Sequence, residues 1–200
     1  MIVLLCGENE FAISEEQKRL CTEYLKDNDS FGLERLDADG LEIARVRDAV
    51  LQLPFLVSKK LVVISNVFAS KLVTELISSL LPDIPESIDV VLVEPRADKR
   101  TKLYKDLSKN KQVQEYAALK GSALDKWMAE YAEKLGSKVS LSDAHYLIDR
   151  VGTEQMLLAR ELEKLSFSNT INLEDINELT DQTLDVGVFD LLDKTFAGKK

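Results

Sequence analysis

Short apolar runs alternate with helical patterns through the first half of this sequence, and this alternation restricts the fold more than any other feature. Three runs are rich in Val, Ile and Leu and lack polar alternation, which is typical of strands buried on both faces: 2–6, 61–65 and 90–93. Weaker strands fit 33–36 and 112–116. Helical patterns occupy the intervals, over 15–26, 41–52, 70–81 and 99–109. Strands that alternate with helices predict an α/β fold, a parallel sheet with helices on both faces.

The beginning of the first helix is predicted from its capping residues. Ser14 and Gln17 stand three residues apart, the spacing of a capping box. We therefore expect that helix to begin at Glu15.

The pattern changes near residue 119, where the strands stop. Apolar residues recur with helical spacing from Leu124 to Leu135, and Gly136 is placed to end that helix. Further helices fit 142–150, 153–166 and 173–179. We expect an α/β domain over residues 1–119 and a small helical domain over 120–182.

The C-terminal segment GVFDLLDKTFAGKK has the pattern of one more helix. Its apolar face would have nothing further to pack on, because the sequence stops there. We therefore expect residues 183–200 to be the start of a truncated third domain.

Charge and composition exclude several classes of protein. The formal net charge of −9 argues against nonspecific DNA binding by the isolated chain, because neutralising phosphates requires a surplus of cations. One local exception is the stretch 96–111, with seven basic residues against two acidic ones. The longest apolar run is far shorter than the roughly 20 residues of a membrane helix, so we expect a cytoplasmic chain without membrane contact. Cys6 and Cys21 fit buried thiols better than a disulfide or a metal pair.

The stretch LLCGENEFAIS begins as a phosphate-binding loop begins, with an apolar strand, one glycine and then a helix. A GxxxxGK[ST] loop also needs a second glycine, a lysine for the terminal phosphates and a hydroxyl for magnesium, and we find none of them. After Gly7 the next glycine is Gly32, and the first lysine is Lys18. Glu8 and Glu10 place negative charge where phosphates would sit. We interpret the stretch as a degenerate nucleotide loop.

Other catalytic machinery is also missing from the sequence. Asn66 and Val67 follow the strand LVVIS, where a magnesium-dependent hydrolase would have an acidic residue. Glu94 follows the next strand and fits a capping or solvated acid. His145 is the only histidine, in a helical pattern that favours a packed or surface role. GxSxG, HExxH and CxxC motifs are absent. We therefore expect no catalysis, no cofactor and no metal.

Six blocks occur in an order and spacing that together carry a family resemblance: LLCGENEFAISEEQKRL, LQLPFLVSKKLVVISN, DKRTKLYKDL, LKGSALDKWMAEYAEKLG, RVGTEQMLLARELEKL and VFDLLDKTFAG. The chain resembles the delta subunit of bacterial DNA polymerase III, the clamp-loader wrench, over essentially its whole length. Members of that family have the fold of the AAA+ ATPases and lack a working nucleotide site. The resemblance therefore implies an AAA+ (P-loop NTPase-like) sheet domain followed by an all-helical lid domain.

The resemblance also implies a binding site. Family members open the ring-shaped sliding clamp with a hydrophobic wedge near the end of the helix before the third strand. Phe55 and Leu56 match the wedge pair, and Pro54 before them departs from some members. The residues by themselves favour another interpretation, because LPFLV directly before a strand is typical of core.

Partners follow from the resemblance as well. It implies binding to the sliding clamp (beta subunit) and, in the full-length protein, to the clamp-loader ATPase subunits and delta-prime. DNA would be contacted only through the assembled complex. The holoenzyme is a DNA-directed DNA polymerase, a nucleotidyltransferase, but this subunit would contribute to DNA replication without catalysis. Residues 183–200 would begin the collar domain that assembles the pentamer, so we expect the chain to be unable to assemble.

Two features have less defined roles. The basic stretch is typical of a solvated helix face, but in the complex it could contact DNA or a neighbouring subunit through its cationic side chains: Arg96, Lys99, Arg100, Lys102 and Lys105. Arg160 lies where an active AAA+ protein has a nucleotide-sensing arginine and would be a relic here. Two rival functions stay open, a diverged P-loop NTPase and a nucleic-acid-binding module that uses the helical half.

Overall fold

The computed structural model describes residues 1–181. It divides into two compact units, Met1–Ala118 and a second unit that begins at Leu119. Each unit has a hydrophobic core of its own. The expected collar segment, 183–200, lies outside the described residues. Along residues 1–181, no helix is both long enough and apolar enough to cross a membrane.

The first unit is built on a parallel sheet of five strands in the order β2-β3-β4-β1-β5. The strands are β1 (Ile2–Cys6), β2 (Leu33–Asp37), β3 (Lys60–Ser65), β4 (Ile88–Glu94) and β5 (Val113–Glu115). Leu4 of β1 lies in register with Leu92 of β4 and with Val113 of β5. The sequence expectation of a parallel α/β sheet is confirmed, with β1 inserted between β4 and β5.

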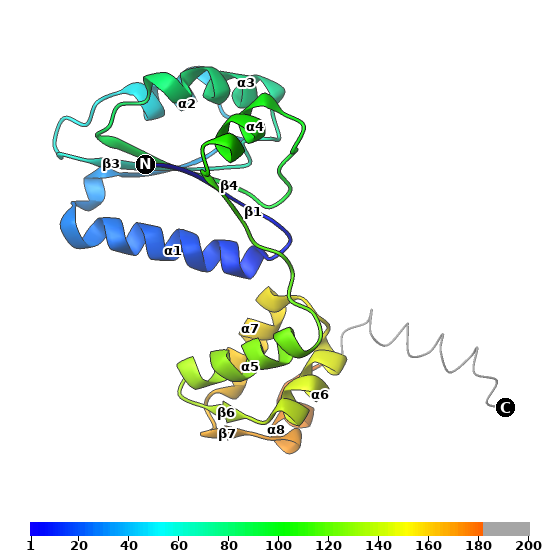
Figure 1. Cartoon of the computed structure of the whole chain (residues 1–200). Coiled ribbons are helices and arrows are strands. Elements are labelled where there is room, and N and C mark those ends of the chain that lie inside the picture. Colours follow the sequence, from blue (N-terminus) through cyan, green and yellow to red (C-terminus); the bar gives the residue numbers. More distant parts are fainter. Residues whose placement is uncertain (182–200) are drawn as a thin grey trace. The chain divides into compact units, whose positions relative to one another are not determined.

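Helices cover both faces of this sheet (Figure 1). Helix α1 (Glu10–Asp27) lies on one face, and the other face carries α2 (Ile43–Leu51), α3 (Lys71–Leu80) and α4 (Lys102–Lys109). Alternate residues of each central strand join the two cores: Leu4 packs in the core that contains α2 to α4, and Leu5 packs in the core that contains α1. This double burial explains why the strands read as continuous apolar runs. Two short 3-10 turns, η1 (Ser30–Gly32) and η2 (Leu81–Asp83), complete the unit.

The largest differences from the expected helix starts in the first unit are at α1 and α4. The capping box at Ser14 is wrong, because α1 begins at Glu10 and the side chain of Asn9 accepts a hydrogen bond of 3.0 Å from Ala12 N. The earlier start lets Phe11 and Ile13 be buried in the helix, which a start at Glu15 would not. Helix α4 begins at Lys102 and not at Lys99, since the Thr101 hydroxyl caps it by accepting from Tyr104 N.

The described part of the second unit, residues 119–181, packs four helices around an apolar core. They are α5 (Ser122–Lys134), α6 (Leu141–Val151), α7 (Gln155–Leu165) and α8 (Leu173–Leu179). The expectation that strands stop after residue 119 is wrong, because β6 (Lys138–Val139) pairs in parallel with β7 (Thr170–Ile171). A strand of two residues is too short to produce a periodic pattern, so local sequence could not reveal it.

Candidate functional site

The loop after β1 has little capacity left to hold a phosphate. Gly7 N donates to the carbonyl oxygen of Pro95 at 3.0 Å, and Asn9 N donates to that of Tyr116 at 3.1 Å. Both amides therefore bind carbonyls, although such amides face the phosphates in a working loop. Gly7 has a φ of +123°, and a Cβ there would overlap the Tyr116 carbonyl oxygen. The glycine is thus required by close packing of two backbones.

The side chains around this loop oppose nucleotide binding as well. Glu8 and Glu10 are exposed at the amino end of α1, where carboxylates interact favourably with the helix dipole and would repel an anion. In the register of a phosphate loop that starts at Gly7, Ile13 takes the position of the lysine, and it is buried. Ser14 takes the position of the magnesium-binding hydroxyl, so the expectation that no such hydroxyl is present is wrong. These side chains would weaken phosphate binding, and the degenerate nucleotide loop stays a prediction.

Polar groups at the ends of β3 and β4 bind neighbouring parts of the chain. Glu94 is buried, and its Oε2 accepts a hydrogen bond of 3.1 Å from Phe68 N. Asn66 has a φ of +58° and donates through Nδ2 to Asp37 Oδ1 at 2.8 Å, which lowers the pKa of Asp37. These contacts hold the loops that follow β3 and β4. The hydrogen bond to Glu94 is the capping contact that the sequence predicted for this residue.

The remaining chemically interesting residues occupy ordinary environments. Cys6 and Cys21 are buried free thiols, as expected, and burial raises the pKa of Cys6. His145 is exposed on α6 with Nδ1 3.3 Å from Asp125 Oδ1. Arg160 is exposed on α7. Within residues 1–181, no three His, Cys, Asp or Glu side chains form a group able to hold a metal ion.

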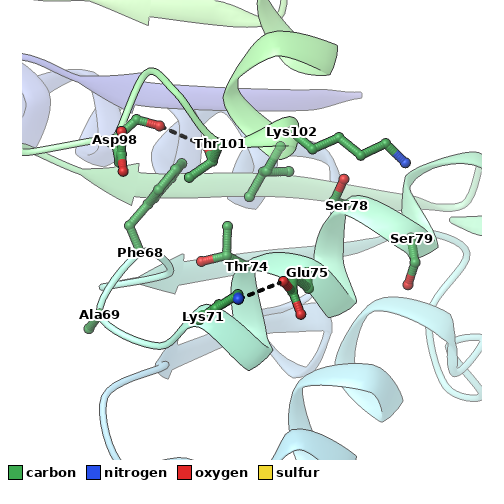
Figure 2. Close-up of a pocket in the computed structure, with 11 residues that line it drawn as sticks. Phe68, Ala69, Lys71, Thr74, Glu75, Ser78, Ser79, Asp98, Thr101 and Lys102 are labelled. Carbon is green, nitrogen blue, oxygen red and sulfur yellow. Dashed lines mark hydrogen bonds and ion pairs between the residues drawn. The ribbon is translucent and has the colours of Figure 1, made fainter.

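A pocket of about 680 Å³, which no sequence motif indicates, lies between α3 and α4. In Figure 2, Phe68, Thr74 and Ser78 line one side, and Asp98 and Lys102 belong to the other. Its charged groups are largely paired. Lys71 lies 3.7 Å from Glu75, and Arg100 holds the pKa of Asp98 at about 2 through hydrogen bonds. A carboxylate held so firmly in its charged form is a poor general base near neutral pH.

Ion pairs divide the five candidate cations of the basic stretch into a paired group and an exposed group. Lys99 binds Glu115 through Nζ, and Arg100 binds Asp98 at 3.0 Å. Arg96, Lys102 and Lys105 are exposed. The five basic side chains are thus not equivalent: two are held by neighbouring carboxylates, and three extend from the loop and the first turn and a half of α4.

Phe55 and Leu56 lie in the loop between α2 and β3 and are 96% and 77% exposed. They are not part of the core, contrary to what their sequence context alone favours. They also lie in the loop after α2 and not in the helix itself, since α2 ends at Leu51. Leu53 in the same loop is 64% exposed. This cluster is the largest departure in the first unit from the rule that big apolar side chains are buried.

A further exposed aromatic side chain lies beside this loop. Phe31 of η1 is 82% exposed and lines the same hollow of about 300 Å³ as Leu53, Phe55 and Leu56. We call these four residues the apolar cluster. Phe31 could not be identified from the sequence, because nothing in the pattern around it distinguishes an exposed phenylalanine from a buried one.

The family model for the DNA polymerase III delta subunit matches residues 3–117, which include the loop after β1 and the apolar cluster. The chain belongs to the DNA polymerase III delta subunit family. The resemblance to the delta subunit family is therefore confirmed. Delta subunits are components of the clamp loader.

Solved structures support the fold of this delta-family chain. It is similar to the Bacillus subtilis DNA clamp loader delta protein with a TM-score of 0.65 and 20% identity, over 96% of this chain and 62% of that one. It also resembles the Thermotoga maritima RuvB Holliday junction branch migration motor, with a TM-score of 0.58 and 13% identity, over 98% of this chain and 70% of that one. The delta-family chain thus spans about 62% of the Bacillus protein. No curated protein matches it. These likenesses confirm the AAA+-like α/β fold.

Proposed function

We propose that this chain is a non-catalytic clamp-loader subunit that binds the sliding clamp and helps to open it for DNA replication. The observation that carries the proposal is the exposure of Phe55 and Leu56, 96% and 77%. Neighbouring large apolar side chains on a surface mark a site of interaction with a partner. Membership of the delta family supports a clamp-loader role, and the apolar character of the pair calls for an apolar pocket on the clamp.

The loop that carries the pair is fixed at its β3 end. Lys59 Nζ binds Asp89 Oδ2 at 2.8 Å, and Lys60 Nζ donates to the carbonyl oxygen of Ala49 in α2 at 2.8 Å. Lys60 also binds Glu34 at 2.8 Å. A loop held in place before binding loses less conformational freedom when the partner arrives, so more of the contact energy contributes to affinity.

The expected contact energy is large enough to act on the clamp. Burying a Phe or Leu side chain contributes about 1.5–3 kcal/mol, so the pair together contributes several kcal/mol. A ligand shifts a conformational equilibrium by the difference in its affinity for the two states. If the pair fits a pocket better in the open clamp than in the closed one, binding favours opening without ATP chemistry in this subunit.

Nucleotide chemistry is assigned to other subunits. The engaged amides of Gly7 and Asn9 and the carboxylates of Glu8 and Glu10 support the absence of a working phosphate site in this chain. The clamp-loader ATPase subunits, together with delta-prime, would bind the full-length protein in the cytoplasm and control when the pair is exposed.

The basic stretch is proposed to contact DNA or a neighbouring subunit only in the assembled complex. Among the five candidate contacts, Arg96, Lys102 and Lys105 are available, because Lys99 and Arg100 are paired with carboxylates. Lys109 and Lys111 of the same stretch are also exposed. These few cations, on a chain with a net charge of −9, are too few for binding DNA alone at physiological salt.

A calorimetric titration with a bacterial sliding clamp tests the proposal. We expect the parent chain to bind and the double variant Phe55→Ala, Leu56→Ala to bind more weakly by at least about 2 kcal/mol. Leu72→Ala is the matched control, since Leu72 is 62% exposed on α3, away from the loop. Full binding by the double variant would place the site elsewhere, and no binding by the parent would refute the function.

A further inference from the structure

The hollow beside Phe55 and Leu56 is formed by two segments that are distant in the sequence. Leu53, Phe55 and Leu56 come from the loop after α2, whereas Phe31 comes from η1 before β2. Phe31 is 82% exposed, more than Leu56 at 77%. The apolar cluster is therefore wider than the pair that the family resemblance identifies.

Local hydrogen bonds fix the backbone at Phe31. Asp29 Oδ1 accepts from Phe31 N at 3.0 Å, and Asp29 O accepts from Gly32 N at 3.1 Å. These bonds close the 3-10 turn around the aromatic residue. Its side chain therefore extends from a turn of defined geometry.

The same turn packs against the segment that follows Leu56. A Cβ on Gly32 would overlap Tyr24 Oη and lie 2.8 Å from the carbonyl oxygen of Lys59. Tyr24 Oη donates a hydrogen bond of 2.7 Å to that carbonyl. Glycine at position 32 therefore lets η1 approach the end of the loop. The two segments that form the hollow are held together at this contact.

The two charged residues that line the hollow, Glu34 and Lys60, form an ion pair with each other at 2.8 Å. Arg45, which is not part of the lining, also binds Glu34. Exposed apolar walls beside paired charges suit an apolar side chain better than a charged group.

A partner that buries Phe55 and Leu56 must also cover their surroundings. Stable interfaces bury about 800 Å² on each partner, roughly 20 to 30 residues, which is far more than two side chains supply. Phe31 lines the same small hollow, so such a partner would reach it. We propose that Phe31 is a third anchor for the sliding clamp, and that the hollow between Phe31 and Phe55 receives an apolar side chain of the clamp. This inference rests on the proposed function.

The experiment compares single substitutions in the 200-residue chain, titrated with a bacterial sliding clamp. We expect Phe31→Ala to raise Kd by roughly tenfold or more, the effect of losing an interface anchor. Phe31→Leu should retain most of the affinity because it keeps apolar surface in the hollow. Phe167→Ala is the matched control: Phe167 is 94% exposed in the second unit and should have no effect.

A double-mutant cycle adds a second measurement. Phe31 and Phe55 would contact the same clamp side chain, so the combined Phe31→Ala, Phe55→Ala variant should lose less than the product of the two single effects. Thermal unfolding of each variant verifies that the fold is kept, as expected for side chains this exposed.

The outcomes separate the inference from the function on which it rests. If Phe31→Ala binds like the parent while Phe55→Ala, Leu56→Ala has lost affinity, Phe31 is not an anchor and the proposed function stands. If neither variant differs from the parent, or the parent does not bind, both fail. If Phe31→Leu loses as much as Phe31→Ala, the contact depends on the aromatic ring and the simple apolar hollow is wrong.

Discussion

Tyr24 Oη, near the end of α1, donates a hydrogen bond of 2.7 Å to the carbonyl oxygen of Lys59, at the end of the loop that carries Phe55 and Leu56. Burial of the phenol raises the pKa of Tyr24, so the hydroxyl remains a donor across the neutral range. The bond joins two segments of the first unit that are far apart in the sequence. It also fixes the surface against which Gly32 packs.

Replacing Tyr24 by Phe should lower the free energy of unfolding by about 1 kcal/mol, because the Lys59 carbonyl loses its donor in a part-buried position. Urea denaturation measures the change. Tyr146→Phe is the control, since Tyr146 Oη binds Asn177 Oδ1 in an exposed position, and its loss should matter much less. Equal effects of both substitutions would mean that the Tyr24 bond has no special structural role.

The double variant Phe55→Ala, Leu56→Ala should keep the stability of the parent within about 0.5 kcal/mol, as surface substitutions usually do. Leu4→Ala provides the contrast. Leu4 is fully buried, so its loss should cost about 2–5 kcal/mol. Thermal unfolding that placed the double variant near Leu4→Ala would assign Phe55 and Leu56 to the core and remove them from the proposed clamp site.

Gly7→Ala should destabilise the first unit by at least about 2 kcal/mol, because the new Cβ would overlap the Tyr116 backbone at a φ of +123°. Gly40→Ala separates the two causes. Gly40 also has a positive φ, +73°, but its Cβ would meet nothing within 4 Å, so only the smaller backbone cost applies. Chemical denaturation of both variants measures the difference, and equal losses would contradict the packing argument.

The chain should not bind ATP with a Kd below about 100 μM, which corresponds to roughly 5.5 kcal/mol. The reason is that Gly7 N and Asn9 N already donate to carbonyl oxygens, and Glu8 and Glu10 oppose an anion. A fluorescent nucleotide titration tests this. Saturation at lower concentration would support the rival interpretation as a diverged P-loop NTPase.

Asp98 should titrate with a midpoint near pH 2, because hydrogen bonds from the Arg100 side chain and backbone lower the pKa of its carboxyl group to about 2. The ordinary value is about 3.9, so the stabilisation is present above about pH 4 and is lost as the pH falls toward 2. Carboxyl NMR should show that Arg100→Ala raises the midpoint. Arg96→Ala, in the same loop, should leave it unchanged.

The fold class could be predicted because its signal is local. A strand buried on both faces is apolar at most positions, and the apolar runs within β1, β3 and β4 show this without reference to the rest of the chain. The missing lysine after Gly7 is likewise visible in the sequence. The start of α1 was missed, because Asn9 and Ser14 are both good capping residues and only the burial of Phe11 and Ile13 favours the earlier one.

The sequence by itself determined the alternating elements, the parallel sheet and the lack of a lysine after Gly7, since each depends on which residues follow one another. Only the tertiary structure decided that Phe55 and Leu56 are exposed, that Phe31 lies beside them and that β6 pairs with β7. Exposure depends on what the rest of the chain leaves uncovered, and LPFLV reads alike in a core or on a surface. The apolar cluster forms because the turn at Gly32 packs against the backbone of Lys59. These residues are distant in the sequence, so no local pattern predicts the contact.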